Sequence, residues 1–174
     1  MNNYPPPYTV SILKAIRMRI EQTYYCFKRV EEIFGLFSYR TEEPSEFNRQ
    51  YEIVNQFYMP IFYINLSKLL RIFKNDPDIE KLLKSTPKQR MEFRKKVRDV
   101  FAKSFEYDEY DNTAYEYFRN SNVYLFEEFE AILEYFRSLL KKLDLNISEN
   151  FESNLNSIDN YWYKNRINIE KLKM

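Results

Sequence analysis

Residues 113–143 read TAYEYFRNSNVYLFEEFEAILEYFRSLLKKL, and this stretch decides the fold. Large apolar side chains recur in it at steps of three and four, the spacing of one face of an α-helix. Thr113 followed by Glu116 has the form of a capping box and predicts where the helix starts. The predicted seam is Tyr115, Phe118, Asn122, Leu125, Phe129, Ile132, Phe136, Leu139 and Leu143. Such a helix must bury its seam against other helices.

Two further long helices are predicted upstream by stripes of the same spacing. The first, about 30 residues long, carries Leu13, Ile16, Ile20, Thr23, Phe27, Val30, Phe34 and Phe37. Residues 38–43 form a polar connection, and Pro44 favours a second helix that begins near Ser45. Its stripe is Tyr51, Val54, Phe57 and Ile61, and it resumes in a shifted phase as Phe62, Leu66, Leu69 and Phe73. Pro60 removes a backbone donor at this point and predicts a kink.

The remaining helices are predicted mainly from their start signals. Thr86, Pro87 and Gln89 form a capping box for a third main helix to about Glu106, with the stripe Phe93, Val97, Phe101 and Phe105. Residues 106–112, EYDEYDN, form the linker to the central stretch. Ser148 is the predicted cap of a last helix, whose stripe is Phe151, Leu155, Ile158 and Trp162. Its many Asn residues favour a weaker helix, because Asn competes for backbone hydrogen bonds.

The composition supports an all-α fold. Gly35 is the single glycine among 174 residues, whereas sandwiches, Rossmann folds and P-loops need several glycines for tight turns and for close approach to phosphate. We therefore expect an up-and-down bundle of four long helices plus a weaker C-terminal helix. A single helical domain is expected over residues 1–174, with residues 1–8 as an irregular tail.

Charge and hydropathy indicate a soluble, cytoplasmic protein. Lys and Arg total 27 against 26 Asp and Glu, so no long-range basic field would draw the whole molecule to nucleic acid. The single cysteine, Cys26, excludes an internal disulfide and fits a reducing compartment. No signal peptide and no apolar run of membrane-spanning length is present, so we expect no membrane association.

The residue inventory excludes most catalytic constellations. The sequence has no histidine, which removes Ser-His-Asp and Cys-His catalysis as well as His-ligated metals. Cys26 lies beside Phe27 of the first stripe and is interpreted as a buried structural thiol. The acidic residues around the linker lack the glycine and spacing of an EF-hand. We therefore assign no catalytic residue, metal or cofactor and lean toward a protein that is not an enzyme.

Arg90, Arg94 and Arg98 are a candidate contact for RNA or for a protein partner. Their spacing of four places three guanidinium groups along one line of a helix, beside the stripe of Phe93 and Val97. The alternative is pairing with the acidic linker, or solvation, and the interspersed acidic residues favour it.

A second candidate contact lies within the central stretch. Arg119 and Asn120, followed by three residues and then Tyr124, resemble the RNxxxH motif of HEPN domains. These are all-helical bundles of toxin-antitoxin, abortive-infection and CRISPR effector proteins, in which paired Arg and His residues at a dimer interface cut RNA. The resemblance implies an inactive member here, because Tyr124 is mostly neutral near pH 7 and does not replace imidazole as a base. Alternatively, Asn122 lies in the helical seam and fixes its register, with Arg119 beside it.

Two functions follow from these observations. The first is a noncatalytic helical binding protein that acts through a protein partner or as a homodimer, in a phage defence, counter-defence or toxin-antitoxin context. The abundant tyrosines, together with Arg and Trp162, suit a protein interface. The alternative is a degenerate HEPN-like RNA-binding protein, or an unusual ribonuclease that uses Arg119 with Tyr124 or with carboxylates and a metal.

Overall fold

The computed structural model describes residues 10–37, 45–99, 112–143 and 145–166. The tail at 1–8, the connection at 38–43, Phe101, Phe105 and the linker at 106–111 therefore lie outside the described residues. Every regular element of the described ranges is helical, which confirms the all-α prediction. The α-helices are α1 (Val10–Phe37), α2 (Ser45–Ile53), α3 (Met59–Ile72), α4 (Pro77–Glu80), α5 (Pro87–Val97), α6 (Asn112–Leu143) and α7 (Leu145–Asn165). A π-helical segment, η1 (Val54–Tyr58), joins α2 to α3.

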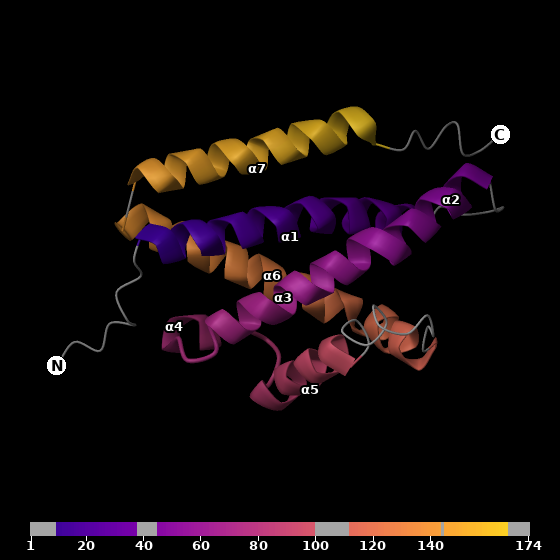
Figure 1. The fold of residues 1–174 in the computed structure, drawn as a ribbon, viewed down its shortest axis with the longest axis horizontal. Helices are drawn as coiled ribbons and strands as arrows, with labels where there is room; N and C mark the ends of the chain where they lie inside the picture. Colours follow the sequence, from indigo (N-terminus) through magenta and orange to yellow (C-terminus); the bar gives the residue numbers. More distant parts are fainter. Residues whose placement is uncertain (1–9, 38–44, 100–111, 144, 167–174) are drawn as a thin grey trace.

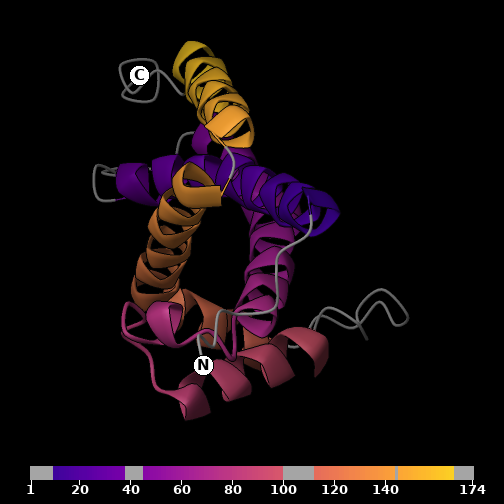
Figure 2. The same cartoon turned by 90° about the vertical axis from the view of Figure 1, so that its left-hand side faces the viewer.

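The long helices reverse direction one after another along the chain (Figure 1). α1 packs against both α3 and α7, while α6 contacts α7 and α5 covers α3. In the side view, α7 and α1 lie at one end of the molecule, α6 and α3 form its two sides, and α4 and α5 close the other end (Figure 2). The helices thus alternate in direction, but α3 and α6 diverge from α1 instead of running parallel to it.

An aromatic cluster from α1, α3 and α6 forms the centre of the core. Phe27 packs on Phe62 and Phe129, with ring centroids 6.0 and 5.3 Å apart. The Phe126 ring packs edge to face on Phe27 and on Phe62, at centroid distances of 5.2 and 5.6 Å. Offset and edge-to-face contacts of this kind stabilise a core beyond the area they bury. The predicted α1 stripe is correspondingly buried from Leu13 to Val30.

The seam predicted for residues 113–143 is confirmed from Leu125 to Phe136, while the side chains of Tyr115, Phe118 and Asn122 lie outside the described residues. Leu125, Phe129, Ile132 and Phe136 have no solvent exposure, but Leu143 is exposed at the end of the helix. α6 begins at Asn112, so Thr113 lies inside its first turn rather than before it. The predicted burial of Leu143 is wrong, because α6 extends beyond the core at this end. Periodicity alone does not show where the core ends along a helix.

A π turn sets the phase of the second predicted stripe. The Met59 N–H donates to the Val54 carbonyl, a bond across five residues that inserts one extra residue into the helix. Because Pro60 has no N–H to offer the preceding turn, this wider turn suits its approach. The phase therefore changes over Val54–Tyr58, before Pro60, where a kink was expected. Phe57 and Ile61 are 58% and 45% exposed, so their predicted burial is wrong.

The helix starts follow the predicted signals in one case and depart from them in another. Thr86 and Gln89 form both bonds of the predicted capping box at the start of α5. α7, in contrast, already begins at Leu145, and the predicted cap Ser148 is buried inside it. Burial of Ile147 against the core explains the earlier start, because packing outweighs a local capping preference.

Candidate protein-binding surface

The motif that resembles a HEPN signature lies on an unbroken helix. α6 is continuous from Asn112 to Leu143, so the break that would turn Arg119 and Tyr124 toward one pocket does not occur. Five residues of an α-helix correspond to about 140° of rotation, which places these two positions on different faces. The side chains of Arg119, Asn120 and Tyr124 lie outside the described residues. No helix break therefore turns Arg119 and Tyr124 toward a common pocket.

The predicted arginine line of α5 is divided between the interior and the surface. Arg90 is buried, and its guanidinium donates to the Ser85 carbonyl and to the Glu80 carboxylate. Arg94 is half-buried, and Arg98 is exposed beside Asp99, 3.1 Å away. Arg90 therefore ties α5 to the end of α4, and only Arg94 and Arg98 remain at the surface for a partner.

A shallow groove lies beside η1. It lies between α1 and α3, has a volume of about 720 Å³, and is called the α1–α3 groove below. Met18 and Ile61 are its exposed apolar residues, while buried Cys26 and Asn65 line its interior. Its lining comprises Met18, Arg19, Glu21, Gln22, Tyr25, Cys26, Tyr58, Ile61, Asn65, Lys68 and Ile158. The groove exists in this form because η1 turns Ile61 outward.

Aromatic side chains from three elements meet at one end of this groove. Tyr25 of α1 lies 6.2 Å from Tyr58 of η1, and 5.7 and 4.8 Å from Tyr161 and Trp162 of α7, measured between ring centroids. The Trp162 indole N–H donates to the Tyr25 carbonyl oxygen at 3.0 Å, and the Arg29 guanidinium lies 5.1 Å from the indole centroid. These four residues, Tyr25, Tyr58, Tyr161 and Trp162, are the tyrosine cluster. Its base is fixed by Trp162, while Tyr161 is exposed.

The charges along the α1–α3 groove are unequally compensated. Glu21, its one acidic lining residue, pairs with Arg17 at 3.4 Å and accepts a hydrogen bond from Asn154 at 2.9 Å. Arg19 donates to the neutral amide oxygen of buried Asn65 at 2.8 Å. Lys68 is exposed, and within the described part of the chain neither Arg19 nor Lys68 forms an ion pair. The groove therefore presents two cations that lack a carboxylate partner.

Cys26 lines the groove with an unreactive thiol. The thiol is buried, and this burial raises its pKa to about 12. A thiol of this kind is almost entirely protonated near neutral pH and is a poor nucleophile. Its position agrees with the predicted structural thiol.

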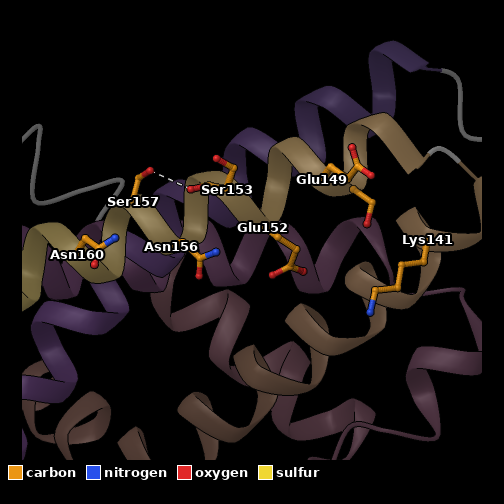
Figure 3. A pocket seen from close by; sticks show the side chains of 8 residues that line it. Lys141, Glu149, Glu152, Ser153, Asn156, Ser157 and Asn160 are labelled. Atoms are coloured by element: carbon orange, nitrogen blue, oxygen red, sulfur yellow. Dashed lines mark hydrogen bonds between the residues drawn. The ribbon is translucent and has the colours of Figure 1, made fainter.

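A second groove follows α7 and has a different character. It is lined by hydroxyl, amide and charged groups that include Lys141 of α6 and Glu149, Glu152, Asn156 and Asn160 of α7 (Figure 3). Arg137 of α6 binds the Glu152 carboxylate at 2.9 Å. The side chains in Figure 3 converge on no common point, and the groove offers no apolar anchor position. We therefore regard the α1–α3 groove as the better candidate for a binding surface.

Two tyrosines of α1 link stability to alkaline pH. Burial, and then a 2.8 Å hydrogen bond to the Asp159 carboxylate, raise the pKa of Tyr24 above its usual value, and burial also raises the pKa of Tyr25. The unfolded chain loses these protons near pH 10, while the folded chain keeps them, so stability is complete below about pH 10 and falls above it. For Tyr24 the expected fall is at most about 1.4 kcal/mol per pH unit. Urea unfolding at several alkaline pH values measures this slope, and Tyr24→Phe should make it shallower.

Comparison with protein families, with curated proteins and with solved structures finds no match for this chain. No helix in the described ranges is long and apolar enough to cross a membrane. The described residues also contain no group of three or more His, Cys, Asp or Glu side chains that could hold a metal ion.

Sequence periodicity missed this surface for a definable reason. Periodicity predicts a buried position for Phe57 and Ile61 and no role for Tyr58, because it treats the η1 segment as α-helical. The adjacent pairs Phe57-Tyr58 and Ile61-Phe62 carried the available signal, since one helix cannot bury both members of such a pair equally. Nothing in the local sequence indicates that Tyr25, Tyr58 and Tyr161 meet.

Proposed function

We propose that this chain is a noncatalytic helical protein that binds another protein through the α1–α3 groove and the adjoining tyrosine cluster. The observation that carries the proposal is the exposure of Phe57 in η1 and of Ile61 just after it, where Ile61 lines the groove together with Tyr25 and Tyr58 of the tyrosine cluster. π turns of this kind are frequent at functional sites. Without a partner, these apolar side chains remain in water.

The composition of the surface supports protein recognition. Tyr, Trp and Arg are enriched among the residues that dominate binding energy, and Met is enriched at interfaces. The tyrosine cluster supplies such side chains on a rigid base, because Trp162 is buried and hydrogen-bonded to α1. A preformed aromatic surface loses little conformational entropy when a partner binds.

Photocrosslinking in the native host tests the proposal. A benzoylphenylalanine replaces Met18 or Tyr161 at the surface just described, and Met91 of α5, which is 63% exposed, serves as the matched control. We expect a discrete protein adduct from the two surface positions and none from Met91. A product of twice the chain's mass would identify the partner as a second copy. Adducts that are equal at all three positions, or absent from all three, would overturn the proposal.

The RNA-binding alternative makes a separate prediction. If Arg119 contacts phosphate, Arg119→Ala should weaken binding of a labelled single-stranded RNA and reduce its dependence on salt. Unchanged binding, measured by fluorescence anisotropy, would remove this alternative. The Met18 and Tyr161 crosslinks would be unaffected by this outcome.

A further inference from the structure

We propose that the α1–α3 groove binds an acidic amphipathic helix of the partner, an inference that rests on the proposed protein-binding function. The shape of the groove, its apolar anchors and its two uncompensated cations favour such a partner.

The shape of the groove suits a helix. α1 and α3 lie side by side, and all the regular elements of the described ranges are helical, so these ranges offer no strand edge for an extended peptide. Partners of a helical groove bind by laying one apolar face along it. The exposed apolar residues Phe57, Ile61 and Ile72 follow one another along η1 and α3, and Met18 faces the groove from α1. An apolar helical stripe on the partner can cover Met18 and Ile61 together, because both line the groove.

The charge of the groove indicates which charges the partner helix should carry beside its apolar stripe. Lys68 is exposed and Arg19 is bonded to a neutral amide, while the single acidic lining residue, Glu21, is already paired. A partner that carries carboxylates beside its apolar stripe would complement both cations, whereas a basic helix would meet uncompensated repulsion. An acidic peptide is therefore favoured over a neutral or basic one.

A single-stranded nucleic acid is the competing occupant, since it would use cations and aromatic rings together. The aliphatic side chains of Met18 and Ile61 argue against it, because they offer neither charge nor a flat stacking surface to a base. The rings of Tyr25, Tyr58 and Trp162 also pack on one another, at centroid distances of 4.8 to 6.2 Å, which limits the access of a base.

Selection from a displayed library of random peptides tests the inference on the full-length chain. The peptides are about 16 residues long, roughly 24 Å as a helix. We expect the selected sequences to be enriched in Asp and Glu and to carry Leu, Tyr or Phe at steps of three and four. No enrichment of acidic residues, or no saturable binder, would overturn the inference.

Two variants of the groove, each with a matched control on α5, test where the acidic peptide binds. Lys68→Glu should weaken the best acidic peptide by about tenfold or more, and Ile61→Asp should remove its binding. The same changes in α5, Lys95→Glu and Met91→Asp, should leave the affinity unchanged, because both residues are exposed and neither lines the groove. Equal losses from the control variants would overturn the inference. Tighter binding of a poly-uridine oligonucleotide that is lost in Lys68→Glu would replace the peptide with a nucleic acid.

The two proposals fail in different ways. If groove crosslinks form but the selected peptides show no preference for acidic residues, the acidic helix is rejected and the protein-binding function stands. If the groove crosslinks are absent, the function itself is rejected.

Discussion

Phe129→Ala is expected to lower the free energy of unfolding by about 3–5 kcal/mol, the range for truncation of a buried Phe. Phe129 has no solvent exposure and lies 5.3 and 5.7 Å from the rings of Phe27 and Phe62. Its removal leaves a cavity between α1, α3 and α6 that these large rings can fill only in part. Urea unfolding followed by circular dichroism measures the loss.

Phe57→Ala is the matched control for this prediction. The substitution is identical, but Phe57 is largely exposed on η1, so its truncation should change stability by no more than about 0.5 kcal/mol. A similar loss in both variants would contradict the register that η1 imposes on this helix. A small loss in Phe129→Ala would instead contradict the assignment of the α6 seam.

The sequence predicts elements well where one apolar stripe continues without interruption. The steps of three and four from Leu13 to Val30 leave one helical phase for α1, and all of these positions are buried. The start of α5 is equally well specified, because Thr86 and Gln89 satisfy each other's backbone donors within four residues. Local chemistry and packing agree at these places.

Other features depend on contacts between distant residues and have no local signal. The tyrosine cluster joins residues from α1, η1 and α7, which periodicity cannot place side by side. In the sequence, Glu128 stands between two other acidic residues, Glu127 and Glu130, although it lies three residues after Leu125 and four before Ile132. Helical geometry therefore places Glu128 on the buried face of α6. A carboxylate is stable there because the backbone N–H groups of Lys84 and Ser85, in the loop before α5, donate hydrogen bonds to it.

Glu128→Ala is the second substitution with a large expected effect, about 2–4 kcal/mol of lost stability. The Glu128 side chain is fully buried, and its Oε1 accepts hydrogen bonds from the backbone N–H groups of Lys84 and Ser85, at 2.9 and 2.7 Å. Removal of this acceptor leaves two backbone donors unsatisfied, at a cost of about 1–3 kcal/mol each. The loss is partly offset, because Oε2 is buried and has no partner among the described residues.

Glu128→Gln and Glu127→Ala separate the hydrogen bonds from the charge. The Gln amide oxygen can still accept from both N–H groups, and the variant removes a charge whose second oxygen is unpartnered, so its stability should stay within about 1 kcal/mol of the wild type. Glu127 pairs with Lys84 Nζ at 2.9 Å on the surface, and its truncation should cost less than about 1 kcal/mol. Urea unfolding of the three variants decides between these contributions. If Glu128→Gln is as unstable as Glu128→Ala, the charge itself holds the loop to α6. If Glu128→Ala is stable, the backbone N–H groups of the loop find other acceptors.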